Sequence, residues 1–142
     1  MIIEELENLY SVRGRDFNNA GRASTAIKDT LKGLGVDPAL IRRVAIAAYE
    51  AEMNVVMYAR FGTMRLRVSP KSVTLDVWDL GPGIPDIEQA LQEGYSTATP
   101  EMREMGFGAG MGLPNIKRIA DAFVITSAVN EGTRLSIRVD QK

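Results

Sequence analysis

The chain has 142 residues and a formal net charge of −1, and it contains neither cysteine nor histidine. A chain of this length is expected to fold as one domain, residues 1–142, around one sizeable core. The missing residue types exclude disulfides, thiolate or imidazole metal sites, histidine-dependent triads and a phosphohistidine within the chain. The balanced charge, the short apolar runs and the acidic amino terminus predict a cytoplasmic protein with no nucleic-acid partner, membrane span or signal peptide.

The first part of the chain predicts one strand followed by two helices. Weak alternation over residues 6–13 favours a strand. A helix capped by Asp16 follows, and glycines shortly after Leu31 end it. Asp37 is predicted to cap a second helix, which begins at Pro38 and continues to about Arg60. Apolar side chains surround most of this second helix, which indicates burial on more than one side.

The second part predicts two hairpins with a loop and helices between them. In chain order, the pattern predicts strands at 64–68 and 73–78, a short helix at 86–93, a lid-like loop at 94–110, a third main helix at about 111–122, and strands at 124–129 and 134–139. This order predicts an α+β fold, a two-layer sandwich in which three main helices pack on one face of a mixed, largely antiparallel sheet.

The first candidate motif is Glu50-Ala-Glu-Met-Asn54, in the middle of the second predicted helix. Residues four apart project from the same side of a helix, so Glu50 and Asn54 can share a hard cation such as Mg²⁺ with its waters. The alternative is a solvated helix edge that carries Glu52 as a surface charge. The apolar surroundings favour a function, because a buried carboxylate costs free energy unless it is paired or used.

The second motif, Asp79-Leu-Gly81-Pro-Gly83-Ile84, follows the strand predicted at 73–78. Its glycines permit positive φ angles and the close approach of a ligand to the backbone. An ionised aspartate only accepts hydrogen bonds, so Asp79 would select the amino group of adenine over the carbonyl of guanine. The same residue types also suit a plain turn.

The third motif is a run of alternating glycines, Gly106, Gly108, Gly110 and Gly112, which leads into the third main helix. Successive exposed amides and the positive potential of a helix amino terminus favour phosphate binding. The run lacks the Gly-Lys-Ser/Thr of a Walker loop, and no strand precedes it as in a dinucleotide fold. A flexible linker is the alternative.

In this order the three motifs resemble the N, G1 and G2 boxes of the GHKL ATPase superfamily, over roughly residues 8–140. Within it the chain is most similar to the anti-sigma regulatory serine/threonine kinases, and among these to the switch kinases of the stressosome, in Asp79–Asp86, Gly94–Thr97 and Gly110–Arg118. The resemblance implies the Bergerat fold and ATP with Mg²⁺ as cofactors. It also implies transfer of the γ-phosphoryl group to a serine or threonine of another protein.

The resemblance further implies a role for each site residue. Glu50 would be the catalytic base, and Asn54 would hold Mg²⁺ against the phosphates. Asp79 would bind the adenine amine, with Gly83 beneath the base. Val55 stands where the family often has alanine, which places a bulkier group near the nucleotide. The other nucleotide-binding residues implied are Gly81, Ile84, Gly106, Gly108, Gly110, Met111, Gly112, Leu113 and Thr133.

The resemblance also implies partner proteins. We expect the acceptor to be a STAS-domain anti-sigma antagonist or a stressosome scaffold protein, with a sigma factor or a PP2C-type phosphatase as further partners and a homodimer as the oligomer. Four alternatives stay open at this point. They are an ATP-binding switch module that sequesters a sigma factor or activates a phosphatase without phosphoryl transfer, a stand-alone ATPase, a histidine-kinase catalytic domain, and a protein that binds no nucleotide.

Overall fold

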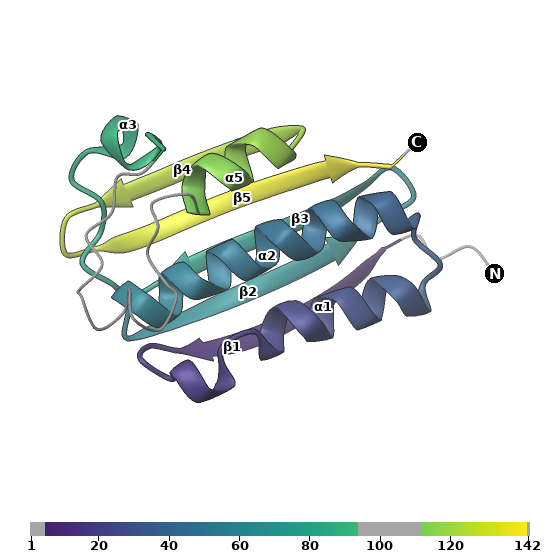
Figure 1. The fold of residues 1–142 in the computed structure, drawn as a ribbon, viewed down its shortest axis with the longest axis horizontal. Coiled ribbons are helices and arrows are strands. Elements are labelled where there is room, and N and C mark those ends of the chain that lie inside the picture. Colours follow the sequence, from purple (N-terminus) through teal and green to yellow (C-terminus); the bar gives the residue numbers. More distant parts are fainter. Residues whose placement is uncertain (1–4, 94–111, 142) are drawn as a thin grey trace.

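The computed structural model describes residues 5–93 and 112–141. Five strands form one sheet in the order β1-β2-β3-β5-β4, and every neighbouring pair is antiparallel. The main helices α1, α2 and α5 lie together on one face of this sheet (Figure 1). The two-layer α+β fold predicted from the sequence is therefore confirmed, and the sheet is antiparallel throughout rather than mixed. No helix in the described ranges is long and apolar enough to cross a membrane.

The elements follow the chain as β1 (Leu6–Arg13), a 3₁₀ turn (Phe17–Asn19), α1 (Arg22–Gly33), α2 (Pro38–Tyr58), β2 (Phe61–Val68), β3 (Ser72–Asp79), α3 (Ile87–Ala90), α5 (Gly112–Ile119), β4 (Ala122–Ala128) and β5 (Gly132–Asp140). Most predicted bounds agree with these to within about one helical turn. The predicted amino-terminal cap of the second helix is also present, because Asp37 accepts a hydrogen bond from the backbone amide of Ala39 (3.3 Å).

The exception is α1, which begins at Arg22 and not next to Asp16. The Asp16 carboxylate precedes the 3₁₀ turn and accepts a hydrogen bond from the side chain of Asn19 (2.7 Å), not from a backbone amide. Gly21 stands immediately before α1 with a φ of +98°, which glycine adopts without a steric cost. The first amides of α1 are bound instead by Glu52, from the neighbouring helix.

The core lies between the sheet and the helix layer, with α2 at its centre. Residues of β2 and β3 that point towards the helices are buried, and except for the buried Asp76 they alternate with less buried residues on the other face. α1 and α5 flank α2, as the prediction of burial on more than one side requires. Ile46 and Tyr49 are exceptions on α2, since both stay more than 40% exposed (41% and 43%).

α2 approaches the sheet most closely where Val55 meets Gly62 of β2. A Cβ atom on Gly62 would lie 2.7 Å from Cγ1 of Val55, whose side chain is 1% exposed. Val55 therefore fills the space left by the missing side chain at position 62. The side chain of Val55 points into the helix–sheet interface, and the expectation that its bulk affects a bound nucleotide stays a prediction.

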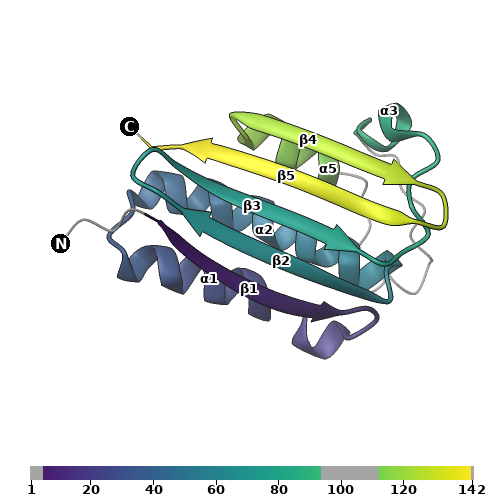
Figure 2. The ribbon, with the colours of Figure 1, turned by 180° about the vertical axis from the view of Figure 1, so that it is seen from behind.

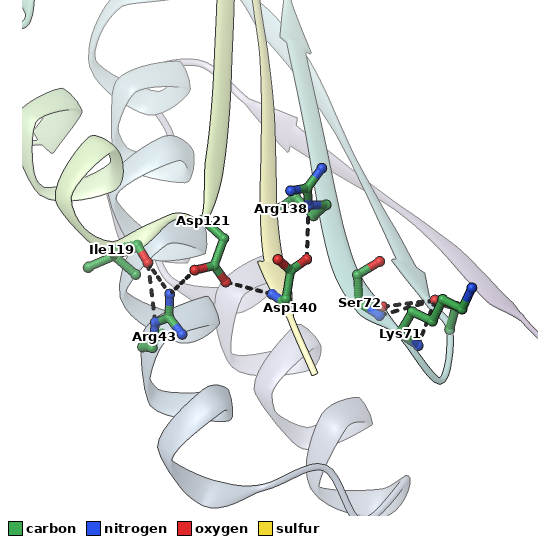
Figure 3. Close-up of polar contacts among 8 residues, drawn as sticks. Arg43, Lys71, Ser72, Ile119, Asp121, Arg138 and Asp140 are labelled. Carbon is green, nitrogen blue, oxygen red and sulfur yellow. Dashed lines mark hydrogen bonds and ion pairs between the residues drawn. The ribbon is translucent and has the colours of Figure 1, made fainter. Parts of the chain in front are cut away.

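A polar network fixes the carboxyl end of α5 to α2 and to the sheet (Figure 3). The Arg43 guanidinium donates hydrogen bonds to the carbonyl oxygen of Ile119 and lies 3.4 Å from the Asp121 carboxylate. Asp121 also accepts a hydrogen bond from the backbone amide of Asp140 at the end of β5 (2.7 Å). A cation at a helix carboxyl end is favourable. The network thereby sets the direction in which α5 presents its amino end.

Candidate functional site

The middle of α2 and the start of α5 form the first part of the candidate site. Glu50 and Asn54 are half-buried on one side of α2, as their spacing predicts. Gly112, the first residue of α5, lies against both: a Cβ atom there would be 3.1 Å from a carboxylate oxygen of Glu50 and 3.7 Å from Oδ1 of Asn54. The amino end of α5, with its positive potential, therefore lies beside this carboxylate and carboxamide.

Burial governs the protonation of Glu50. The loss of hydration raises the pKa of its carboxyl group above the ordinary glutamate value, and a hydrogen bond with the Asn115 side chain lowers this pKa by a smaller amount. The side-chain oxygen of Asn115 accepts a hydrogen bond from Arg118 (2.9 Å), so its amide nitrogen is the donor to Glu50. A carboxylate with a raised pKa is a better general base once it is deprotonated.

Asn115 was not among the residues predicted from the sequence. Its signal was nevertheless present, because it lies three residues after Gly112, and residues three apart share one side of a helix. A polar residue in the first turn after the glycine run is therefore expected to face the same site as Gly112.

Asp79 forms the second part of the site, at the end of β3. Its carboxylate accepts hydrogen bonds from the backbone amides of Thr133 (Oδ1, 3.2 Å) and Gly81. Burial has the larger effect and raises the pKa of Asp79, whereas these two hydrogen bonds lower it. The backbone thus orients the carboxylate, which keeps further lone pairs for a ligand.

The glycine turn after β3 is joined to the β4–β5 hairpin. Gly83 has a φ of +76°, and a Cβ atom there would overlap the carbonyl oxygen of Ala128, so only glycine fits. The Ile84 amide donates to the Ser127 hydroxyl (2.7 Å), which in turn bonds the hydroxyl of Thr133 (2.8 Å). Ser127 connects two residues predicted from the sequence but was itself missed, because its place depends on the pairing of β4 with β5.

The two parts of the site are connected along α2. A Cβ atom on Gly81 would lie 3.2 Å from Cα of Ala59, which follows the last residue of α2 and is five residues beyond Asn54. A hollow of about 310 Å³ adjoins this end and is bordered by Tyr58, Gly81 and Asn130 among others. The candidate site therefore runs along α2, from Glu50 to the end of the helix.

The third motif is described only from Gly112 onward. Gly106, Gly108, Gly110 and Met111, together with the predicted lid at 94–110, lie outside the described residues. Leu113 is partly buried, and its side chain packs against the hydrophobic core.

The oxygen donors of α2 fit a nucleotide-bound Mg²⁺. Among residues 5–93 and 112–141 there is no group of three or more acidic side chains placed to hold a metal. Mg²⁺ that arrives with phosphates keeps several waters and needs only one or two protein oxygens. The side-chain oxygen of Asn54, next to Gly112 and the Glu50 carboxylate, is suited to supply one.

A comparison with known families matches residues 16–139 to the histidine kinase-like ATPase domain. The chain belongs to this family. It is 31% identical to the serine/threonine-protein kinase RsbT of Bacillus subtilis (strain 168) over 112 residues, which are 76% of this chain and 78% of the relative. It is 30% identical to the anti-sigma F factor of Caldanaerobacter subterraneus subsp. tengcongensis over 105 residues, 69% of this chain and 70% of the relative. These relatives place the chain in the anti-sigma regulatory kinase group of the family.

Solved structures share the fold of this anti-sigma regulatory kinase. The mycobacterial sensor histidine kinase MprB aligns with a TM-score of 0.56 at 16% identity, over 95% of this chain and 97% of that one. A chain of the SiaB–SiaC complex from Pseudomonas aeruginosa aligns with a TM-score of 0.56 at 11% identity, over 94% and 89%. At these identities the likeness shows the fold alone, and the roles of Glu50, Asn54 and Asp79 remain predictions.

Proposed function

We propose that the protein is an ATP-dependent serine/threonine kinase of the anti-sigma regulatory type, which phosphorylates a STAS-domain antagonist in a partner-switching pathway. The observation that carries this proposal is the meeting of Glu50, Asn54 and Gly112, where a carboxylate with a raised pKa lies beside an oxygen donor at a helix amino end. The family and the relatives named serine/threonine-protein kinase and anti-sigma F factor support it.

In the proposed reaction, the hydroxyl oxygen of the acceptor serine or threonine bonds to the γ-phosphorus of ATP. Glu50 accepts the proton of this hydroxyl group. The bond from that phosphorus to the β–γ bridging oxygen breaks, and ADP leaves. Phosphoryl transfer depends mainly on positioning and on charge neutralisation. Mg²⁺ held by Asn54 would neutralise charge on the phosphates, and the amides at the start of α5 would bind phosphate oxygens.

Adenine selection is assigned to Asp79. The amides of Thr133 and Gly81 fix the direction of its carboxylate, and the remaining lone pairs accept a hydrogen bond from the amino group of the base. The hydroxyl pair of Ser127 and Thr133 and the glycine turn at Gly83 hold the surrounding backbone in place.

We place this kinase in the cytoplasm and treat residues 1–142 as one kinase domain. Its acceptor is a STAS-domain antagonist or a stressosome scaffold protein, and a sigma factor or phosphatase is the partner that the phosphorylation releases or engages.

The test is phosphate transfer from γ-labelled ATP to a purified STAS-domain protein of the same organism. Glu50→Gln should lower the transfer rate at least about 100-fold, since a positioned base contributes about 10²–10⁴-fold. Binding of a fluorescent ATP analogue should change little, because the variant keeps the size of the side chain. Glu88→Gln, an exposed glutamate on α3, is the matched control and should transfer phosphate at the wild-type rate.

Two other results would change the assignment. A wild-type transfer rate in Glu50→Gln would show that Glu50 is not the base. A nucleotide-dependent complex with the acceptor, but no labelled phosphate on it, would support the alternative function of an ATP-binding switch module.

A further inference from the structure

One face of the sheet is covered by none of the described helices (Figure 2). A buried ion-pair cluster lies on this face. Asp76 of β3 lies on this face, on the opposite side of the strand from the core residues Leu75 and Val77, yet it is only 2% exposed. Its Oδ2 atom accepts hydrogen bonds from Arg65 (2.8 Å) and Arg67 (3.0 Å) of β2. The two guanidinium groups therefore cover the carboxylate, and the carboxylate fixes both of them in place.

The strand register puts this cluster in the middle of the face. Residues directly opposite each other across the five strands form one row, which reads Leu9, Arg65, Asp76, Ser136 and Val124. The two apolar residues at the ends of this row are 62% and 60% exposed. An adjacent row places Trp78 beside Arg134, with threonine and serine residues on the other strands.

Trp78 lies between two of the arginines. The guanidinium carbon of Arg65 is 5.6 Å from the centroid of the Trp78 ring, and that of Arg134 is 5.7 Å from it. Stacking on an aromatic ring restrains a guanidinium group without removing its hydrogen-bond donors. These arginines therefore lose less conformational freedom when they bind another group than freely rotating side chains do.

The charge of this face is opposite in sign to that of the whole chain. This face of the strands carries five arginines, at positions 13, 65, 67, 134 and 138, against three carboxylates, Glu7, Asp76 and Asp140. Asp79, the last residue of β3, lies on the other side of its strand. Asp76 and Asp140 are already paired with arginines of the same face. Arginine and tryptophan are typical of the centres of protein interfaces. We define the arginine platform as these five arginines together with Trp78.

We propose that the arginine platform docks an acidic segment of a partner protein. Carboxylates of the segment bind the exposed guanidinium groups, and its apolar side chains cover Trp78, Leu9 and Val124. A second copy of the chain fits poorly, because pairing two such faces brings arginines against arginines. The exposed Leu9 and Val124 favour a protein segment over nucleic acid, since a phosphate backbone has no apolar side chains to cover them. The platform lies on the opposite side of the sheet from α2, so this docking goes beyond the proposed phosphoryl transfer and does not depend on it.

Trp78 supplies the measurement, because it is the only tryptophan in the chain. The full-length protein is titrated with a short synthetic peptide in which glutamates alternate with leucines, while tryptophan emission is recorded and heat is measured in parallel by calorimetry. We expect a saturable change in emission that weakens as salt is raised. Arg134→Glu should weaken peptide binding about tenfold, because it replaces an attraction at the centre of the platform by a repulsion.

Matched controls separate docking on the platform from a general charge effect. Arg42→Glu makes the same charge change at an exposed position of α2, in the helix layer, and should leave the peptide affinity unchanged. A peptide with lysines in place of the glutamates should not bind. A saturating ATP analogue should leave the affinity of the acidic peptide unchanged, because its site lies on the other side of the sheet. Circular dichroism verifies that each variant is folded.

Several outcomes would overturn the proposal. These are no change in Trp78 emission at millimolar acidic peptide, an equal response to the lysine peptide, and an equal loss of affinity in Arg42→Glu and Arg134→Glu. Tighter binding of a single-stranded RNA than of the peptide would assign the platform to nucleic acid. A concentration-dependent dimer that shields Trp78 would assign it to a second copy of the chain. Each of these readouts is independent of phosphoryl transfer, so the two proposals can fail separately.

Discussion

Two glutamates of α2, Glu50 and Glu52, have opposite environments although they are only two residues apart. An α-helix turns by about 100° per residue, so the two side chains point about 200° apart. Glu50 is half-buried beside Gly112, whereas Glu52 is 2% exposed and accepts backbone hydrogen bonds from the start of α1. The reading of Glu52 as a surface charge is wrong, because the amides that it binds belong to another helix.

The first prediction concerns Glu52. Glu52→Ala should lower the free energy of unfolding by about 2–4 kcal/mol, because it leaves three amides, those of Gly21, Ala23 and Ser24, without an acceptor. Urea denaturation measures the loss. Glu88→Ala, at an exposed position of α3, should change the stability by less than about 0.5 kcal/mol. Equal effects of the two substitutions would contradict the anchoring role of Glu52.

The second prediction concerns Asn115, whose hydrogen bond lowers the pKa of Glu50. Asn115→Ala removes this bond, so the already raised pKa of Glu50 should rise further. The base acts when deprotonated, and its rate increases as pH rises through the pKa, so the acid limb of kcat/KM should move to higher pH. The limb should stay in place in Lys117→Ala, which truncates an exposed side chain of α5 and leaves the bond between Asn115 and Glu50 intact. If the acid limb of the kcat/KM profile does not move in Asn115→Ala, Glu50 is not the group that accepts the proton.

The third prediction concerns base selection by Asp79. Asp79→Asn replaces an ionised acceptor by an amide that can also donate, so the affinity for ATP should fall about 10- to 100-fold, as expected for a hydrogen bond to a charged group. The affinity for GTP should fall less, because the amide nitrogen can donate to the guanine carbonyl. Competition against a fluorescent nucleotide measures both, with Asp29→Asn on α1 as the control. An equal loss of affinity for ATP and for GTP would exclude Asp79 from recognition of the base.

Among the elements, α2 was the most predictable and α1 the least. The Asp-Pro start and the long apolar pattern of α2 are local signals, and the structure confirms them. The start of α1 depends on Gly21 and on the distant Glu52, and neither the backbone angle nor the partner can be inferred from helical periodicity. The close contact between Val55 and Gly62 is likewise tertiary, because it depends on how α2 crosses β2.

The fourth prediction tests that contact. Gly62→Ala should destabilise the protein by about 1–3 kcal/mol, because the added methyl group overlaps both γ-carbons of Val55 in a fully packed interface. Val55→Ala in the same chain should restore much of the loss by making room for it. Gly33→Ala is the control, since no atom lies within 4 Å of the position its Cβ would take. Strictly additive effects at positions 55 and 62 in thermal unfolding would contradict this packing.

At the scale of the whole molecule, the layers could be predicted from the element order, but the order of the strands could not. The last hairpin places β5 next to β3 and leaves β4 at the edge, and either strand satisfies the same alternating pattern. This choice brings Thr133 next to Asp79 and Ser127 next to Ile84. Asp79 and Ile84 belong to a motif that can be identified in the sequence. The position of Ser127 beside Ile84 depends on the strand order and could not be predicted.

The fifth prediction is the pH dependence of stability. Burial raises the pKa values of Glu50 and Asp79, so the folded state holds these protons more tightly than the unfolded chain, and stability should increase as pH falls towards their ordinary values of 4.5 and 3.8. For Asp76, burial alone would raise the pKa, but its bonds to Arg65 and Ser136 and the nearby arginine charges outweigh it and lower the pKa. The stability that Asp76 contributes is therefore present above its unfolded value of 3.8 and is lost below it.

Thermal unfolding as a function of pH should consequently pass through a maximum on the acid side of neutrality. Asp76→Asn should lower stability at neutral pH and flatten the fall below 3.8, where the unfolded aspartate takes up its proton. Asp79→Asn should reduce the rise on the way to the maximum. If stability falls equally steeply at acid pH in Asp76→Asn and in the wild type, other carboxylates cause this loss of stability.

The main helices cover only one face of the sheet (Figures 1 and 2). Two surfaces of this small domain can therefore be occupied at once, one in the helix layer at Glu50 and one on the bare sheet at Trp78. A substrate joined to a segment held on the bare sheet would meet the kinase at a fixed local concentration, which for short flexible connections is in the millimolar range. Phosphorylation inside such an assembly would then depend on the reach of the connecting chain and hardly on the total amounts of enzyme and substrate. The geometry of the sheet would thereby turn a bimolecular encounter into an intramolecular one.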